Sequence, residues 1–330
     1  MLKNILGNRF SILYLIPFIL GSLSILSFQP FNFTLINFII LPIFFYLIVY
    51  INKKSRGNYR KKPYKKNFFL FGLSFGFGFY IFGISWITNS LTFDNNFKIL
   101  IPFAFILVPL FLALFSAITT LIVGPYLKLN FPSLFLFSGS LALSDYIRTK
   151  IFTGFPWNLW AYSTSGINEI LQILNISGLH SFNLLVITSF SSLIIFFFKF
   201  NKINKLIYLS FFVGLIISLY IYGNYEINKN KEFIKQNDQT IFVKIVSPNF
   251  DLKYGLSEQE IREKLEKLVK YSDPDKEKKT LFIWPEGVFS GYSFDEVEIF
   301  KEIIQKNFSK KHNIVFGVNR LERKSGNFFN

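Results

Sequence analysis

Long apolar runs, separated by short polar or basic stretches, fill the first two thirds of the chain. Runs of about 17–25 predominantly apolar residues are typical of helices that cross a bilayer. Pro30 follows the first run with no small-residue cleavage site before it, so this run is predicted to be a retained span and not a signal peptide. The pattern predicts seven spans, at residues 10–28, 33–51, 68–87, 99–123, 133–150, 171–198 and 206–222. Residues 1–223 are therefore expected to form a transmembrane domain.

The pattern changes after residue 223. Residues 224–239 are polar and are predicted to be a linker. Beyond them, short apolar runs alternate with amphipathic segments, which favours an α/β arrangement. Ser257 and Glu260 have the spacing of a capping box at the start of one of these helices. The expected order is a strand at 240–246, a helix at 257–271, a strand ending at residue 284, a helix at 294–308 and a strand at 313–319.

The segment Thr280–Gly291, TLFIWPEGVFSG, carries the first candidate for chemistry. Its apolar run suits a strand buried on both faces, and Pro285 ends that strand because it has no backbone N–H. Glu286 then stands where a buried strand opens into a loop, which is where open α/β sheets place their reactive groups. A Glu desolvated beside Trp284 would suit a general base. A solvated surface Glu is the alternative.

Composition and charge agree with a membrane protein. The 330 residues are 51% hydrophobic and carry a net charge of +16. Residues 1–223 hold 17 Lys and Arg against 3 Asp and Glu, whereas residues 224–330 are nearly neutral. The excess therefore belongs to the apolar part, which argues against a nucleic-acid interface. Eight of the basic residues lie in residues 52–67, so this loop is predicted to be cytoplasmic and residues after 223 to be outside the cytoplasm.

Several polar or small residues interrupt the predicted spans. Asp145 and Arg148 lie three residues apart on one face of the fifth span, as a structural ion pair or as a site for lipid headgroups. His180 in the sixth span is expected to be a hydrogen-bonded donor between helices. In the third span, small residues predict close helix packing; these are Gly72, Gly76, Gly78 and Gly83.

A segment rich in aromatic residues, FTGFPWNLWAYS at 152–163, follows the fifth span. Gly154 and Pro156 break the helix, and Trp157, Trp160 and Tyr162 have rings suited to a membrane surface. A simple aromatic belt is one interpretation. The other is a re-entrant loop that shapes an entrance for lipid.

These features together resemble the apolipoprotein N-acyltransferase family of bacterial inner-membrane enzymes. Residues 153–157 (TGFPW) with Tyr162 carry the resemblance most strongly, together with Trp284-Pro285-Glu286, which the wider nitrilase-like group shares. FQPF at 28–31 and residues 246–249 with Lys253 support it. The resemblance implies a polytopic helical membrane bundle of about seven spans, followed at 240–330 by the N-terminal part of an α/β nitrilase-like sandwich facing the periplasm.

The resemblance also implies an activity: transfer of an acyl chain from a phospholipid to the N-terminal diacylglyceryl-cysteine of an apolipoprotein. A Glu–Lys–Cys triad would carry it, and Glu286 matches the Glu. Trp157, Tyr162 and Pro156 would border the lipid entrance, with Lys253 and Tyr254 as further substrate-side candidates. It implies no cofactor, no metal and no nucleic-acid partner.

The chain departs from the family in having no Cys and no Lys in the family's lysine motif. Asp145 and Tyr254 replace a usual Glu and a frequent Trp. A C-terminally incomplete acyltransferase, a separate polypeptide that completes the fold, and an inactive membrane-anchored binding relative are the three explanations. A lipid transporter is a weaker alternative, because the spans show no internal repeat. An incomplete sandwich would expose strand edges, so residues 224–330 alone are predicted to be poorly stable.

Overall fold

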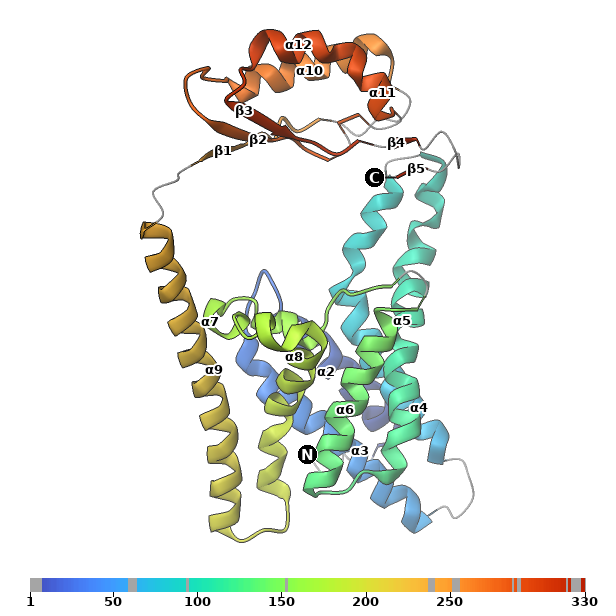
Figure 1. The fold of residues 1–330 in the computed structure, drawn as a ribbon. Helices are drawn as coiled ribbons and strands as arrows, with labels where there is room; N and C mark the ends of the chain where they lie inside the picture. The colour runs from blue at the N-terminus through green and yellow to red at the C-terminus, as the bar shows by residue number, and fades with distance from the viewer. Residues whose placement is uncertain are drawn as a thin grey trace. The chain divides into compact units, whose positions relative to one another are not determined.

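A computed structural model describes residues 8–58, 64–92, 95–151, 154–236, 241–250, 256–286, 288–289, 292–318, 320–321 and 328–329. The chain divides into two compact units, residues 1–233 and 234–330. The first unit is a bundle of helices and the second is built on a small sheet, as Figure 1 shows.

The first unit is helical almost throughout its described length. Its α-helices are α2 (Ile16–Ser24), α3 (Asn37–Asn58), α4 (Tyr64–Gly83), α5 (Ile101–Val123), α6 (Phe131–Arg148), α7 (Asn168–Leu171), α8 (Leu174–Ser191) and α9 (Lys202–Gln236). A π-helical segment, Ser11–Leu15, leads into α2. Segments of 3-10 helix flank these helices at Ile25–Ser27, Thr34–Ile36, Ser85–Thr92, Asn95–Leu100, Gly124–Tyr126, Trp160–Thr164 and Ser192–Phe197.

Several of these helices are suited to a bilayer. Among the described residues, four are long and apolar enough to cross a membrane, or five if α4 and the helix after it, bent by 48°, form one span. The helical segment Ser11–Ser27 is shorter, and α6 carries four serines with Asp145 and Arg148. These apolar helices indicate a membrane protein, and the seven spans stay a prediction.

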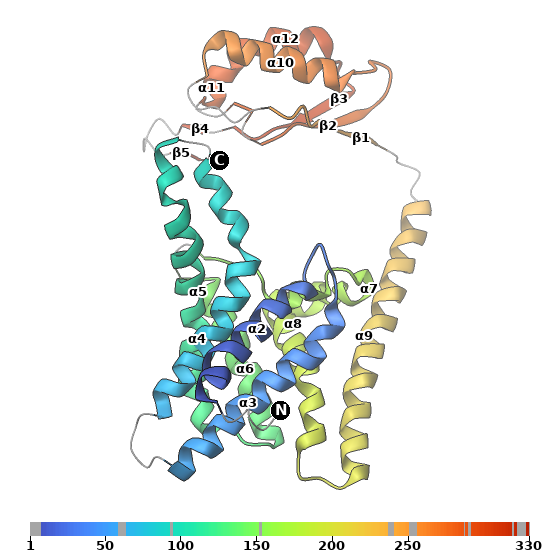
Figure 2. The same cartoon turned by 180° about the vertical axis from the view of Figure 1, so that it is seen from behind.

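Small residues bring α4 close to its neighbours, as the sequence predicted. A Cβ added at Gly76 would lie 2.8 Å from the Cα of Ala113 on α5, and Gly72 faces the same helix. A Cβ at Gly78 would lie 2.2 Å from the backbone oxygen of Phe18 on α2. In Figure 2, α2 and α3 lie on the near side of the bundle. Glycines on two faces of α4 thus let it pack between α2 and α5.

The helix α9 extends beyond the last predicted span. Residues 224–236, predicted as a linker, continue it as far as Gln236. No Gly or Pro interrupts this stretch, and Glu226 and Lys229 form an i,i+3 pair with N···O 3.8 Å. The polar composition therefore marks the end of the apolar surface of the helix and not the end of the helix.

The second unit has the predicted order of strands and helices. Its elements are β1 (Phe242–Ile245), α10 (Glu258–Ser272), β2 (Thr280–Ile283), α11 (Phe294–Val297), a 3-10 turn (Glu298–Phe300), α12 (Lys301–Asn307), β3 (His312–Val315), β4 (Arg320–Leu321) and β5 (Phe328–Phe329). Strands β1, β2 and β3 are adjacent and parallel, whereas β4 and β5 form a separate antiparallel pair. The predicted capping box is present, with the Ser257 N–H 2.8 Å from a Glu260 carboxylate oxygen.

The two faces of the parallel sheet differ in burial. Helices α10 and α12 lie over one face (Figures 1 and 2), and Phe282 and Trp284 are buried among their side chains. On the other face, Leu281 and Ile283 are only half-buried, and their partners in the ladder include the exposed Ile245. The prediction of a strand buried on both faces is therefore wrong for β2, because none of the described residues covers its second face.

Candidate functional site

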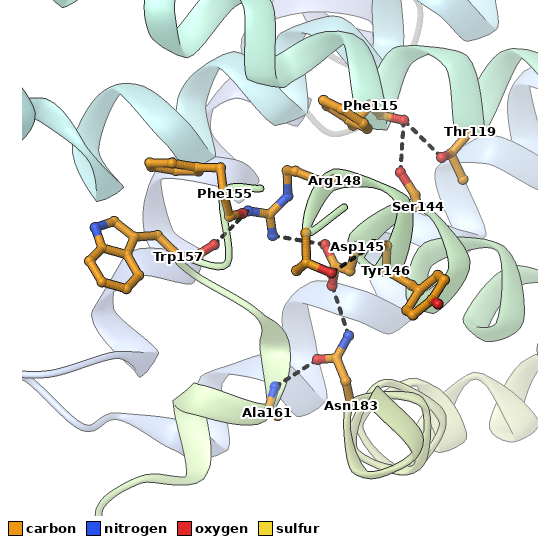
Figure 3. A network of polar contacts seen from close by, with 11 residues as sticks. Phe115, Thr119, Ser144, Asp145, Tyr146, Arg148, Phe155, Trp157, Ala161 and Asn183 are labelled. Atoms are coloured by element: carbon orange, nitrogen blue, oxygen red, sulfur yellow. Dashed lines mark hydrogen bonds and ion pairs between the residues drawn. The ribbon is translucent and has the colours of Figure 1, made fainter. Parts of the chain in front are cut away.

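The loop after α6, residues 154–165, is a candidate site within the first unit (Figure 3). The helix α6 ends at Arg148, and Gly154, six residues later, has a φ of +88° that suits glycine and few other residues. The segment then runs without regular helix to the 3-10 turn Trp160–Thr164. The segment around Gly154 and Pro156 is outside regular helix, as predicted, although α6 already ends at Arg148.

Arg148, the last residue of α6, is the centre of this loop's polar contacts. Its side chain is only 1% exposed, and one guanidinium nitrogen lies 3.1 Å from Asp145 Oδ1. Another donates to the backbone oxygens of Phe155 and Trp157, each at 2.7 Å. The Tyr80 ring centroid lies 5.5 Å from the guanidinium carbon. The pair is therefore an ion pair inside the bundle, as the structural interpretation predicted.

Asn183 on α8 completes the network, and sequence reasoning missed it. Its amide nitrogen donates to Asp145 Oδ2 at 2.9 Å, and its amide oxygen accepts the Ala161 N–H at 2.8 Å. The residue is fully buried. An amide within a predicted span is a signal for an interhelical polar contact, but the same helix also holds Asn175, His180 and several serines, so this signal does not single out Asn183.

The loop's aromatic residues divide into exposed and buried rings. Trp157 is 42% exposed, with its ring 6.0 Å from that of Trp86. Pro156 is exposed and Tyr162 is half-buried. Trp160 is instead buried, and its ring stacks on Phe79 at 5.3 Å. The same loop therefore carries the three predicted entrance residues, while Trp160 belongs to the core and not to a surface belt.

His180 differs from the prediction. Its Nδ1 is buried without a hydrogen-bond partner, and its ring meets Tyr146 edge-on at 4.9 Å. The expectation of a hydrogen-bonded donor is therefore wrong for this nitrogen. An aromatic contact with α6 replaces it.

Glu286 is a separate candidate, and it lies in the second unit. It follows the end of β2 and is exposed. A Cβ added at Gly317, just after β3, would lie 3.4 Å from Glu286 Cγ, so the side chain lies at the carboxyl ends of two adjacent strands. The predicted desolvation beside Trp284 is not observed, because the Trp284 ring turns into the core and donates to Ser272 Oγ at 3.0 Å.

Two predicted residues, Lys253 and Tyr254, lie outside the described residues. Among the residues that the structure does describe, no group of three or more His, Asp or Glu side chains is placed to hold a metal ion. Of the two candidates, Glu286 thus offers an exposed carboxylate. The loop at residues 154–165, in the other unit, offers aromatic rings.

Comparison with known sequences identifies the lineage of the first unit. The profile of the apolipoprotein N-acyltransferase N-terminal domain matches residues 20–194, just over half of the chain. The chain belongs to the apolipoprotein N-acyltransferase family. The matched region contains the 154–165 loop with Arg148, Asp145 and Asn183, whereas Glu286 lies beyond it.

Named relatives extend the match into the second unit. An apolipoprotein N-acyltransferase of Rhodopseudomonas palustris is 25% identical over 88% of this chain and 54% of its own length. Those of Rickettsia typhi and Brucella melitensis are each 30% identical, over 83% and 54% of this chain and 51% and 33% of their own lengths. The chain thus spans about half the length, or less, of these curated relatives.

Proposed function

We propose that this protein takes part in the N-acylation of the N-terminal diacylglyceryl-cysteine of apolipoproteins, the last step of lipoprotein maturation. The acyl donor is a membrane phospholipid and the acceptor is the diacylated apolipoprotein. The observation that carries the proposal is the family match over residues 20–194. This region includes the aromatic loop, whose backbone oxygens accept hydrogen bonds from Arg148. Several apolar helices support a reaction at a membrane.

Glu286 is the residue that we assign to the chemistry, as the general base. The support is geometric, because its carboxylate is exposed and lies at the carboxyl ends of two parallel strands. Such a base would take the proton from a thiol that attacks the phospholipid ester, and would pass it to the alkoxide of the departing lysophospholipid. It would then take a proton from the amine that attacks the thioester, and return it to the departing thiolate. None of the 330 residues is a Cys, so this chain can supply the base of such a reaction and not its thiol.

The loop around Trp157 is assigned to the entrance for phospholipid. Trp157 and Pro156 are exposed, and Tyr162, five residues after Trp157, is half-buried. An indole has an apolar body and an N–H donor, so it suits contact with both an acyl chain and a headgroup.

The proposed location is the bacterial inner membrane, with seven spans and the N-terminus in the cytoplasm. The basic stretch at residues 52–67 favours the cytoplasm for that loop. Residues after 223 would then face the periplasm, where the nitrilase-like part at 240–330 would meet lipoprotein substrates.

The test uses the protein expressed from its gene, in membranes that lack another N-acyltransferase. A diacylated lipopeptide is added, and its mass is followed with and without added phospholipid. The proposal predicts a gain of one acyl chain that depends on phospholipid. No gain in mass would favour an inactive binding relative, and phospholipid moving across vesicles without a change in the lipopeptide would favour a transporter.

A further inference from the structure

The loop between α6 and α8 presents a problem of backbone hydrogen bonding. In a bilayer, a carbonyl or N–H outside a helix is costly unless the protein itself supplies a partner. Residues 154–159 are not in a helix, although they connect two helices of the bundle. The partners of these backbone groups therefore decide whether the loop has one fixed shape.

Arg148 supplies three of those partners. Its guanidinium donates to the oxygens of Phe155 and Trp157, and its own backbone oxygen accepts the Phe155 N–H at 3.1 Å. The loop is thus bonded to one residue through three contacts. A guanidinium is suited to this role because its donors have a fixed planar arrangement.

Asp145 and Asn183 hold this arrangement in place. Asp145 offers one carboxylate oxygen to Arg148 and the other to Asn183. Asn183 in turn binds the Ala161 N–H. A continuous set of hydrogen bonds therefore fixes the loop at residues 155, 157 and 161, on both sides of Trp157 (Figure 3).

We propose that Arg148, Asp145 and Asn183 are positioning residues that hold Trp157 and Tyr162 in the geometry needed to receive a phospholipid. The phospholipid substrate in this inference rests on the proposed function. The positioning of the loop by these three residues rests on the hydrogen bonds alone. The three residues do not touch the reacting atoms. They act through the loop, so their loss raises the KM for phospholipid more than it lowers kcat.

The test compares Arg148→Lys and Asn183→Ala with Ser140→Ala as a control. Lysine keeps the charge but replaces the planar fork with one nitrogen, which cannot bond two carbonyls and a carboxylate in this arrangement. Asn183→Ala removes the bonds to Asp145 and Ala161. Ser140 lies on the same helix as Arg148, and its hydroxyl bonds to Leu136 of that helix.

The first readout is the fluorine NMR signal of 5-fluorotryptophan at position 157, assigned with Trp157→Phe. It shifts or broadens in both test variants, whereas the signal of Trp284 in the other unit stays unchanged. The second readout is acyl transfer, in which the phospholipid KM rises about tenfold or more and kcat changes less than about threefold. Ser140→Ala matches the wild type in both.

An unchanged Trp157 signal in Asn183→Ala overturns the proposal even if Arg148→Lys does not fold. A shifted signal with an unchanged phospholipid KM overturns the link to substrate. If the wild type transfers no acyl chain, the proposed function fails, and the fluorine signal still decides whether the network positions the loop.

Discussion

The two tryptophans of the aromatic loop, Trp157 and Trp160, lie in different surroundings. Both follow the helix break, and the sequence assigns both to a membrane surface. The structure exposes Trp157 beside Trp86 and buries Trp160 against Phe79. The sequence could not separate them, because the partner of Trp160 lies about eighty residues earlier in the chain.

Substitution separates these two roles. Trp157→Ala should lower phospholipid use and cost less than about 1 kcal/mol of stability, because its ring lies at the surface. Trp160→Ala should cost about 3–5 kcal/mol, because it empties a packed aromatic site. Thermal unfolding in detergent and phospholipid-dependent acyl transfer measure the two effects. Equal losses of stability would contradict the assignment.

At the scale of elements, the sequence predicted the order of strands and helices of the second unit and the helix break before the loop. It placed one helix over residues 294–308, where the structure has α11, a 3-10 turn and α12. The last long helix, α9, also runs past its predicted end, because the polar residues that begin at 224 end its apolar surface and not the helix itself. Hydrophobic pattern follows burial, so it predicts where an element is covered better than where it ends.

The glycines of α4 give a prediction at this scale. Gly76→Val should destabilise the bundle by about 1–3 kcal/mol, because the added atoms meet the backbone of α5. Gly139→Val is the matched control, since a Cβ at Gly139 on α6 meets nothing within 4 Å. The melting temperature of each variant in detergent checks it. A loss that is no larger for Gly76→Val than for Gly139→Val would contradict close packing of α4 on α5.

The start of α11 gives a prediction for pH. Glu296 accepts hydrogen bonds from the Ser293 N–H and hydroxyl at 2.7 and 2.8 Å, and these lower its pKa below the ordinary 4.5. A lowered folded-state pKa stabilises the helix above the ordinary value, and this contribution is lost as the pH falls through the folded-state pKa. The protection factors of the α11 amides, which are corrected for the intrinsic pH dependence of exchange, should therefore fall on acidification. In Glu296→Gln this acid-dependent part should be absent, and an identical pH dependence would contradict it.

At the scale of the whole molecule, the second unit has a sheet with one covered and one open face. The open face presents the apolar side chains of Val243, Ile245 and Val315, which are all exposed among the described residues. Exposed apolar sheet surface and an unpaired edge favour association over a stable monomer. This exposed apolar surface agrees with the prediction that residues 224–330 alone are poorly stable, which remains to be measured.

Expression of residues 224–330 alone tests that prediction. The isolated segment should show no cooperative thermal transition and weak amide protection, because its core is covered from one side only. Circular dichroism on heating and hydrogen exchange measure both. A sharp transition with strongly protected strands would show that the segment is stable by itself.

The account's central claim is that Glu286 acts as the base in acyl transfer from phospholipid. The most direct measurement uses membranes in which the protein is expressed from its gene and supplies a phospholipid with an isotopically labelled acyl chain. Label is followed in a hydroxylamine-sensitive thioester on the polypeptide that carries the thiol, and in the lipopeptide. Glu286→Gln should abolish both signals, while Glu302→Gln, an exposed Glu on α12, keeps them. Wild-type labelling by Glu286→Gln would remove Glu286 from the mechanism and contradict the account.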